Sequence, residues 1–121
     1  MSTSATMSLA EMEQDLNDKI LSGDALAAFD EYYADNCIMQ EGSDEPFVGK
    51  ALNRKREEDF FAAVTEVRAL LVHDVAVGDG VTMSTWHFDV TIEGVGDVVF
   101  DQVAVRYWQD GKIAKERFFK A

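Results

Sequence analysis

Cysteine and positive charge are both scarce in this sequence, and each shortage narrows what the protein can be. The 121 residues include one cysteine, Cys37, so no disulfide can form within the chain, and a reducing compartment is the natural inference. Lysine and arginine number 11 against 23 acidic residues, which gives a net charge of −12, and the only basic residue before Lys50 is Lys19. A chain this acidic repels phosphate groups, so we expect neither nucleic acid nor a membrane as its partner.

Long apolar runs are also absent. No run approaches the roughly 20 residues that a membrane-spanning helix needs, and the first residues lack the basic and apolar regions of a signal peptide. A composition of 47% hydrophobic and 28% charged residues is ordinary for a soluble globular protein. We therefore expect a cytoplasmic protein that forms one domain over residues 1–121, with residues 1–7 disordered.

Helix signals dominate the first half of the chain. Ser8 opens a capping-box pattern that predicts a first helix, and Asp24 is a suitable N-cap for a second helix directly after it. Further along, the pattern predicts a short strand at 36–41, a loop at 42–49 and a third helix at 50–63.

From residue 66 onward, β-branched residues punctuated by glycine replace the helical pattern. Four long strands joined by short turns are predicted at 66–77, 81–93, 97–108 and 112–120. The pair Asp110-Gly111 between the last two is a strong hairpin signal, because both central turn positions tolerate positive φ. Helices followed by meandering strands predict an α+β fold, with three helices packed on one face of a curved antiparallel sheet.

Two features that suggest a phosphate or metal site have plainer explanations. Gly78 and Gly80 lead into a strand rather than a helix, so they are interpreted as a turn. His73 and His87 stand alone, without the i, i+3 or i+4 partner that metal-binding helices use. By strand parity, His87 also lies opposite the apolar face that carries Trp86. We expect neither a metal nor a cofactor.

Two carboxylates fall on mainly apolar strand faces. Glu41 has the parity of Met39, and Asp101 has the parity of Val103. Desolvation on such faces would raise their pKa values, and two such groups in one cavity could serve as general base and general acid. The alternative interpretation is that each carboxylate pairs with a nearby lysine or arginine and is purely structural.

Several segments resemble a known superfamily. The residues at 23–36, 47–50, 110–113 and 116–119 resemble the nuclear transport factor 2-like superfamily, and within it the SnoaL-like branch, over about residues 8–121. The resemblance implies a cone-shaped, cystatin-like α+β domain, usually a homodimer, with an internal cavity between the helices and the curved sheet. Members include polyketide cyclases, ketosteroid isomerase, limonene epoxide hydrolase, scytalone dehydratase and non-catalytic binders, and the enzymes mostly use an Asp or His in the cavity as a base.

The resemblance also implies particular site residues. Similar sequences carry acidic residues where Glu41 and Asp101 stand, a lysine near Lys55 and often a glutamate in place of Gln102. We therefore predict Asp101 and Glu41 as catalytic residues. The predicted ligand-binding side chains are Tyr33, Met39, Lys55, Trp86, Phe88, Gln102, Glu116 and Phe119.

The sequence departs from two members of the superfamily. Laid over ketosteroid isomerase, it has Gln40 at the position of the catalytic aspartate and Val103 near the position of the protonated aspartate, so ketosteroid chemistry is not expected. The His–Asp arrangement of the polyketide cyclases is not clearly reproduced either, because His87 lies on the wrong strand face by parity.

Two functions of different kinds remain open, together with a homodimer. The first is a protein that binds a small, largely apolar molecule and acts as a cofactor-independent isomerase, lyase, cyclase or hydrolase with a carboxylate as proton acceptor. The second is a non-catalytic ligand-binding or accessory dimerisation module, or a scaffold whose cavity is filled by aromatic residues. In each case we expect dimerisation through the sheet face away from the helices, because the strand at 97–108 carries large apolar residues on both faces.

Overall fold

The computed structural model describes residues 7–120, so the predicted disorder of residues 1–7 lies almost entirely outside the described residues. The elements follow the predicted order closely, and all three helices precede the four long strands. They are α1 (Leu9–Leu21), α2 (Ala25–Tyr32), β1 (Tyr33–Glu41), β2 (Phe47–Val48), α3 (Lys50–Ala63), β3 (Val64–Val77), β4 (Val81–Ile92), β5 (Gly96–Gln109) and β6 (Lys112–Lys120).

Local signals set the boundaries of the helices. Ser8 caps α1 as predicted: its hydroxyl accepts a hydrogen bond from the Glu11 amide at 3.1 Å, and the Glu11 carboxylate accepts one from the Ser8 amide at 2.8 Å. Asp24 occupies the N-cap position of α2 but makes no side-chain capping bond. The third predicted helix, at 50–63, is confirmed at both ends.

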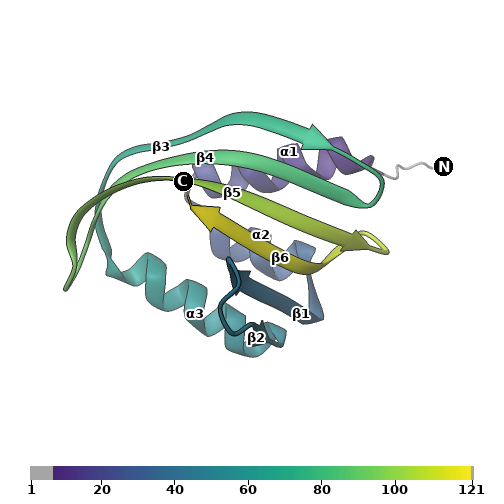
Figure 1. Cartoon of the computed structure of the whole chain (residues 1–121), viewed down its shortest axis with the longest axis horizontal. Coiled ribbons are helices and arrows are strands. Elements are labelled where there is room, and N and C mark those ends of the chain that lie inside the picture. The colour runs from purple at the N-terminus through teal and green to yellow at the C-terminus, as the bar shows by residue number, and fades with distance from the viewer. Residues whose placement is uncertain (1–6, 121) are drawn as a thin grey trace.

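The strands form one six-stranded sheet in the order β2-β1-β6-β5-β4-β3, so the last strand lies inside the sheet (Figure 1). The meander from β3 to β6 is antiparallel, as predicted. The sheet is nevertheless mixed, because β1 runs parallel to β6, which the expectation of an antiparallel sheet missed. A parallel neighbour needs a long crossover, and here the connection between β1 and β6 contains α3 and three other long strands.

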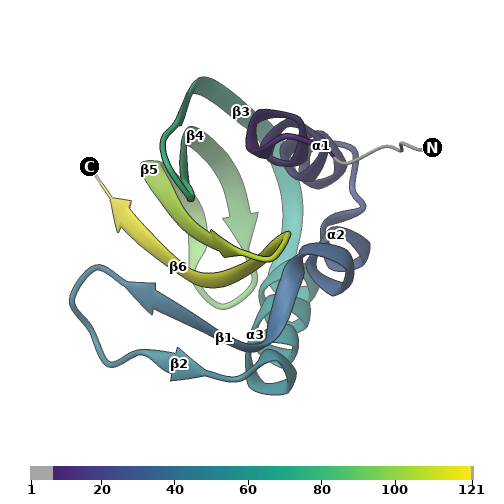
Figure 2. The same ribbon diagram turned by 90° about the vertical axis from the view of Figure 1, so that its right-hand side faces the viewer.

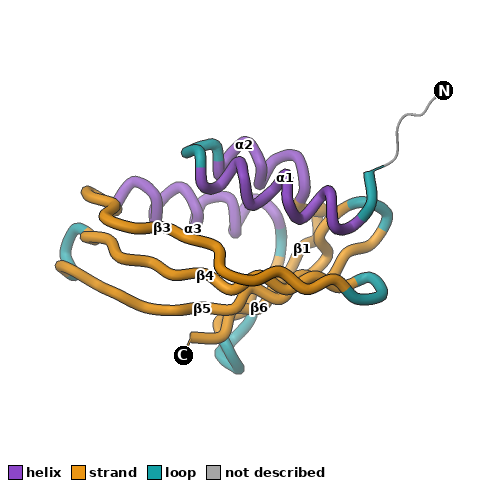
Figure 3. Tube along the Cα trace, turned by 90° about the horizontal axis from the view of Figure 1, so that it is seen from above, coloured by secondary structure: helices purple, strands orange, loops and turns teal. Residues whose placement is uncertain are grey.

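Turns and bulges shape the sheet. The predicted hairpin between β5 and β6 is confirmed, since Asp110 and Gly111 have φ values of 53° and 78°, as a type I′ turn requires. The pairing of β3 with β4 shifts register at three places, and such bulges bend a strand. Figures 2 and 3 show the result: a curved sheet with all three helices on its concave side. The α+β class predicted from the sequence is therefore confirmed.

Cross-strand register decides which side chains point toward the helices. Trp86 on β4 lies opposite Gln102 on β5, and both face the helices, whereas the next pair, His87 and Asp101, faces away. Under α1 and α2 the inner face is closed by a hydrophobic cluster in which Leu16, Phe29, Tyr32, Trp108 and Ile113 are buried. The other end of the concave face, under α3, is not filled in this way.

Candidate functional site

A cavity of about 360 Å³, partly open to solvent, lies between α3 and the inner face of the sheet. Most of its wall is aromatic or aliphatic. The apolar lining consists of Ile20, Tyr33, Met39, Phe60, Phe61, Leu70, Trp86, Phe88, Phe100 and Phe118. The volume falls within the range of small-molecule pockets, and so does the mixture of apolar walls with a few polar groups.

The polar lining of the cavity comes from α3 and from three strands of the sheet. It consists of Glu41, Arg56, Glu57, Gln102, Arg106, Glu116 and Lys120. In the sheet, Met39 on β1 lies beside Glu116 on β6, which lies beside Arg106 on β5, so this row crosses the deep end of the cavity. Gln102 on β5 lies opposite Lys120 on β6, at the other end of this part of the wall.

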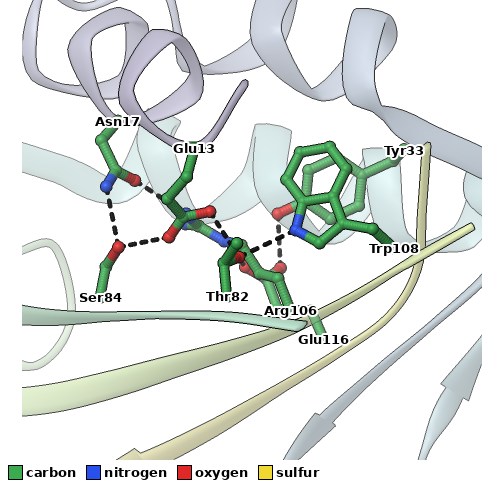
Figure 4. A network of polar contacts seen from close by, with 8 residues as sticks. All are labelled: Glu13, Asn17, Tyr33, Thr82, Ser84, Arg106, Trp108 and Glu116. Carbon is green, nitrogen blue, oxygen red and sulfur yellow. Dashed lines mark hydrogen bonds and ion pairs between the residues drawn. The ribbon is translucent and has the colours of Figure 1, made fainter. Parts of the chain in front are cut away.

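A buried charge cluster forms the deep end (Figure 4). The Arg106 guanidinium donates to Glu116 at 2.7 Å and to Glu13 of α1 at 3.0 Å, and all three side chains are almost fully buried. Burial opposes the charge on Arg106, but the neighbouring carboxylates more than offset this and raise its pKa above the usual range. Two carboxylates thus share one guanidinium in the core, and removing the guanidinium would leave both unpaired.

Neutral partners complete the cluster on the side of α1. Asn17 accepts from Arg106 at 2.7 Å and donates to Ser84 at 2.8 Å, and Ser84 donates to Glu13. Thr82 also donates to Glu13, at 2.7 Å. Every member therefore has a partner from another element, which ties α1 to β4 and β5 and holds Arg106 in one orientation.

Tyr33 connects this cluster to the cavity wall. Its hydroxyl donates to Glu116 at 2.5 Å, and both residues line the cavity. Burial raises the pKa of Tyr33 well above its ordinary value, and the nearby negative charge of Glu116 adds to the effect. Burial also raises the pKa of Glu116, although Arg106 opposes it. The pair therefore presents a neutral phenol and an electrostatically balanced carboxyl group to the cavity.

Glu57, on the inward side of α3, is different because nothing in the described chain pairs with it. Among residues 7–120, no hydrogen bond or ion pair engages its carboxylate. The residue is only partly buried, and its side chain lines the cavity. Loss of hydration raises the pKa of Glu57 to about 7, with Glu116 and Glu41 adding to the rise and Arg56 opposing it.

Seven of the ten predicted site residues lie on the wall of the cavity. Glu41 is there as expected, and among residues 7–120 it has no ion pair with lysine or arginine. The six predicted ligand-binding residues that line the cavity are Tyr33, Met39, Trp86, Phe88, Gln102 and Glu116. Whether any of them binds a ligand stays a prediction.

Asp101 does not line the cavity, and the expectation that it shares a cavity with Glu41 is wrong. Its side chain is 62% exposed on the outer face of the sheet and lies 2.7 Å from His87 Nδ1. The physical reason is the register of β5, in which Gln102 and Phe100 point inward and Asp101 between them points outward. A His–Asp pair therefore exists in this chain, but it faces away from the cavity.

Lys55 and Phe119 are also misplaced by the prediction. Lys55 projects from the outer side of α3, where it is 69% exposed and pairs with Asp59 at 2.9 Å. Phe119 is 40% exposed on the outer sheet face, because the residues on either side of it, Phe118 and Lys120, point into the cavity.

The residue that sequence reasoning missed is Glu57, along with Arg56 and the phenylalanines at the end of α3. A weak signal was present. Asn53, Glu57 and Phe60 recur at the i, i+4, i+7 spacing of one helix face, and Asn53 is fully buried. The run of six charged residues at 54–59 hides this spacing, because it places charge on every side of the helix.

Two further properties of the described residues complete the description of the site. Among residues 7–120, no three or more histidine, cysteine, aspartate or glutamate side chains are grouped so that they could hold a metal ion. Over the same residues, no helix is both long and apolar enough to cross a membrane.

The fold and its cavity define the class of protein. Three helices on the concave face of a curved mixed sheet, with a pocket between them, are the architecture of the nuclear transport factor 2-like proteins. Within this class, residues 9–120 match the model of the SnoaL-like domain family, and the chain belongs to that family.

Solved structures agree with this assignment. A protein from Mesorhizobium loti described as a SnoaL-like polyketide cyclase is 28% identical, with a TM-score of 0.83 over 93% of this chain and 98% of that chain. A protein from Jannaschia sp. with the same description is 13% identical, with a TM-score of 0.78 over 97% and 91% of the two chains. A protein of unknown function with a cystatin-like fold from Xanthomonas campestris is 18% identical, with a TM-score of 0.81 over 95% and 92%. A search of curated proteins found no match.

Proposed function

We propose that this protein binds a small, largely apolar molecule in the cavity beneath α3. The observation that carries the proposal is the contrast between the two ends of the concave face. One end is filled by a hydrophobic cluster, whereas the other encloses about 360 Å³ behind aromatic walls. An apolar space of this size beside unpaired polar groups is what a ligand pocket requires. We expect the protein to work in the cytoplasm, without a metal or cofactor.

A cavity-filling variant with a matched control tests the proposal. Leu70 lines the cavity, and its neighbour Leu71 is exposed on the outer sheet face. The neutral fluorescent probe N-phenyl-1-naphthylamine should bind the wild-type protein and the Leu71→Trp variant. Leu70→Trp places an indole in the cavity and should weaken binding by at least roughly tenfold. Equal binding by both variants would show that the probe lies elsewhere. Native mass spectrometry of the purified protein would identify a retained natural molecule.

A second candidate function is cofactor-independent isomerisation, lyase or cyclase chemistry, and the Mesorhizobium loti protein is described as a polyketide cyclase. Glu57 favours it, because an unpaired carboxylate whose pKa is raised to about 7 is suited to remove a proton from carbon at neutral pH. Asp101, which points away from the cavity, has no part in it.

Hydrogen exchange offers a direct test of this second candidate. In heavy water, the protein should accelerate deuterium incorporation next to the carbonyl of 2-tetralone, as followed by NMR. Glu57→Gln should reduce the acceleration by about 100-fold or more, and Asp101→Asn should leave it unchanged. Exchange no faster than in buffer would remove this candidate and leave the binding function standing.

We also propose a homodimer that forms through the outer face of the sheet. Five large apolar side chains are at least 40% exposed there: Leu71, Met83, Val99, Tyr107 and Phe119. A stable interface buries about 1,200 Å² or more in total, and these five side chains come from all four strands of the meander. Light scattering should give a dimer for the wild type and a monomer for Tyr107→Lys. Val95→Lys, in an exposed turn away from this face, serves as the control.

A further inference from the structure

The polar groups of the cavity fall into two sets. Tyr33, Arg106 and Glu116 are satisfied by one another and by the buried cluster behind them. Glu41, Glu57 and Gln102 are not: among residues 7–120, no side-chain hydrogen bond or ion pair engages them. The second set is therefore the part of the wall that a bound molecule can satisfy.

Glu41 and Glu57 line the same cavity from two different elements. Glu41 lies on β1 and Glu57 on α3, and the charge of Glu41 makes a small contribution to the rise in the pKa of Glu57, after burial and Glu116. Two carboxylates that face one space repel each other unless a proton or a cation lies between them.

The chain's own cations near the cavity are already engaged or exposed. Arg56 stacks on the Phe47 ring at 3.6 Å, and it donates to Asn53 at 3.0 Å. The Arg106 guanidinium belongs to the buried cluster. Lys120 is exposed and lies 4.8 Å from the centre of the Phe100 ring. None of these groups forms an ion pair with Glu41 or Glu57, so the two carboxylates lack a counter-ion among the described residues.

The aromatic walls favour positive charge independently of the carboxylates. The faces of benzene and indole rings carry partial negative charge and attract organic cations. Rings surround the space from both sides: Phe60 and Phe61 on α3 face Trp86, Phe88 and Phe100 on the sheet. The net charge of −12 adds a long-range attraction for cations.

We propose that the molecule bound in the cavity is a hydrophobic amine in its protonated form, whose ammonium group lies between Glu57 and Glu41 while its hydrocarbon part packs among the aromatic rings. This inference rests on the proposed binding function and specifies its ligand class. An ammonium held by Glu57 occupies the carboxylate that proton abstraction would need, so the inference goes with binding and not with the second, catalytic candidate.

Proton release distinguishes this ligand class from others. Five groups act on the charge of Glu57: Glu116 and Glu41 favour its protonation, and Arg56, Arg106 and an incoming ammonium oppose it. With a pKa of about 7, the Glu57 carboxyl is about half protonated at pH 7. An ammonium lowers that pKa, so binding releases up to about half a proton. A neutral ligand leaves this balance nearly unchanged, and an anion causes proton uptake.

Three probes of one shape provide the test: 2-aminotetralin, 2-tetralol and tetralin-2-carboxylate, titrated by calorimetry at pH 7 in buffers of different ionisation enthalpy. The amine should bind roughly tenfold more tightly than the alcohol, since hydrogen bonds to charged groups are stronger than neutral ones, and the carboxylate should bind most weakly. Only the amine should release protons. Glu57→Gln should abolish both the preference and the proton release. Glu58→Gln is the matched control, because the adjacent Glu58 is exposed and pairs with Arg54.

Each other outcome has a definite meaning. If the alcohol or the carboxylate binds as tightly as the amine, or if Glu57→Gln keeps the amine preference, the inference is wrong and the binding function stands. If none of the three binds while N-phenyl-1-naphthylamine still does, only the amine inference fails. If the naphthylamine also fails to bind, the proposed function falls with it. Melting curves of both variants show whether a loss of binding is a loss of folding.

Discussion

Replacing Glu57 by glutamine should stabilise the protein at pH 8 and leave its stability near pH 4 almost unchanged. Burial raises the pKa of Glu57 from 4.5 to about 7 in the folded protein. At pH values between these two pKa values, the folded state therefore holds a proton that the unfolded state has released. Over that range the free energy of unfolding falls as pH rises. Above pH 7 the wild type carries the full penalty of a charged, unpaired carboxylate in the cavity.

The expected gain in the free energy of unfolding follows from the size of the pKa shift of Glu57. One pKa unit corresponds to about 1.4 kcal/mol, so a rise from 4.5 to about 7 corresponds to about 3 kcal/mol, or somewhat less where solvent reaches the partly exposed side chain. Glutamine keeps the shape and cannot ionise. The variant should therefore gain about 2–3 kcal/mol over the wild type at pH 8, which raises the melting temperature by roughly 10 °C.

Urea unfolding of the two proteins at half-unit steps from pH 4 to pH 8 measures the difference directly. All other titrating groups are common to both proteins and cancel in the difference. Glu58→Gln, which removes an exposed ion pair with Arg54, should show a nearly constant difference of below about 1 kcal/mol. If the difference in the free energy of unfolding between Glu57→Gln and the wild type is equally constant from pH 4 to pH 8, the carboxylate is not desolvated and the reasoning about the cavity is wrong.

Three further changes probe the cluster and the outer face. Arg106→Met leaves two buried carboxylates without a counter-ion and should cost about 3–5 kcal/mol in urea unfolding, against below about 1 kcal/mol for Arg54→Met at an exposed pair. Tyr33→Phe removes the hydrogen bond to Glu116 and should cost about 1–3 kcal/mol by the same measurement; no loss would mean that the bond contributes nothing. Asp101→Asn should change stability by less than about 1 kcal/mol and leave naphthylamine binding intact, because its side chain is exposed; weaker binding would contradict its position outside the cavity.

Most of the fold could be predicted from local signals in the sequence. Capping at Ser8, the Asp110-Gly111 turn and the change from helical to β-branched residues each depend on neighbours in the chain, and each was predicted correctly. The parallel pairing of β1 with β6 was not, since it joins segments about 80 residues apart and no local pattern specifies it.

The site was harder to predict because β5 is apolar on both faces. Phe100 and Trp108 lie on one side of the strand, and Val103 and Tyr107 lie on the other, so alternation does not show which side faces the helices. The prediction therefore included Asp101, which points outward, together with its inward-pointing neighbour Gln102. In β4 the alternation is sharper, and there the inward position of Trp86 was predicted correctly.

The helices pose a different problem, because polar residues there replace apolar ones at inward positions. Glu13 and Asn17 share a face of α1 with Leu16, and a helical wheel alone gives no reason to bury them. Their partners lie on strands about 70 residues or more further along the chain, at Ser84 and Arg106. A buried polar residue of this kind becomes predictable only once the tertiary neighbours that satisfy it are known.

The place of β6 in the sheet has a consequence for how the protein is made. β6 is synthesised after every other strand, yet it lies between β1 and β5. Until it emerges from the ribosome, the strand edges that it will join have no partner, and Arg106 lacks its Glu116. Unpaired strand edges promote association between chains, and distant pairings form slowly. The sheet therefore closes only once β6 is available, and until then the edges of β1 and β5 are open to pairing with another chain.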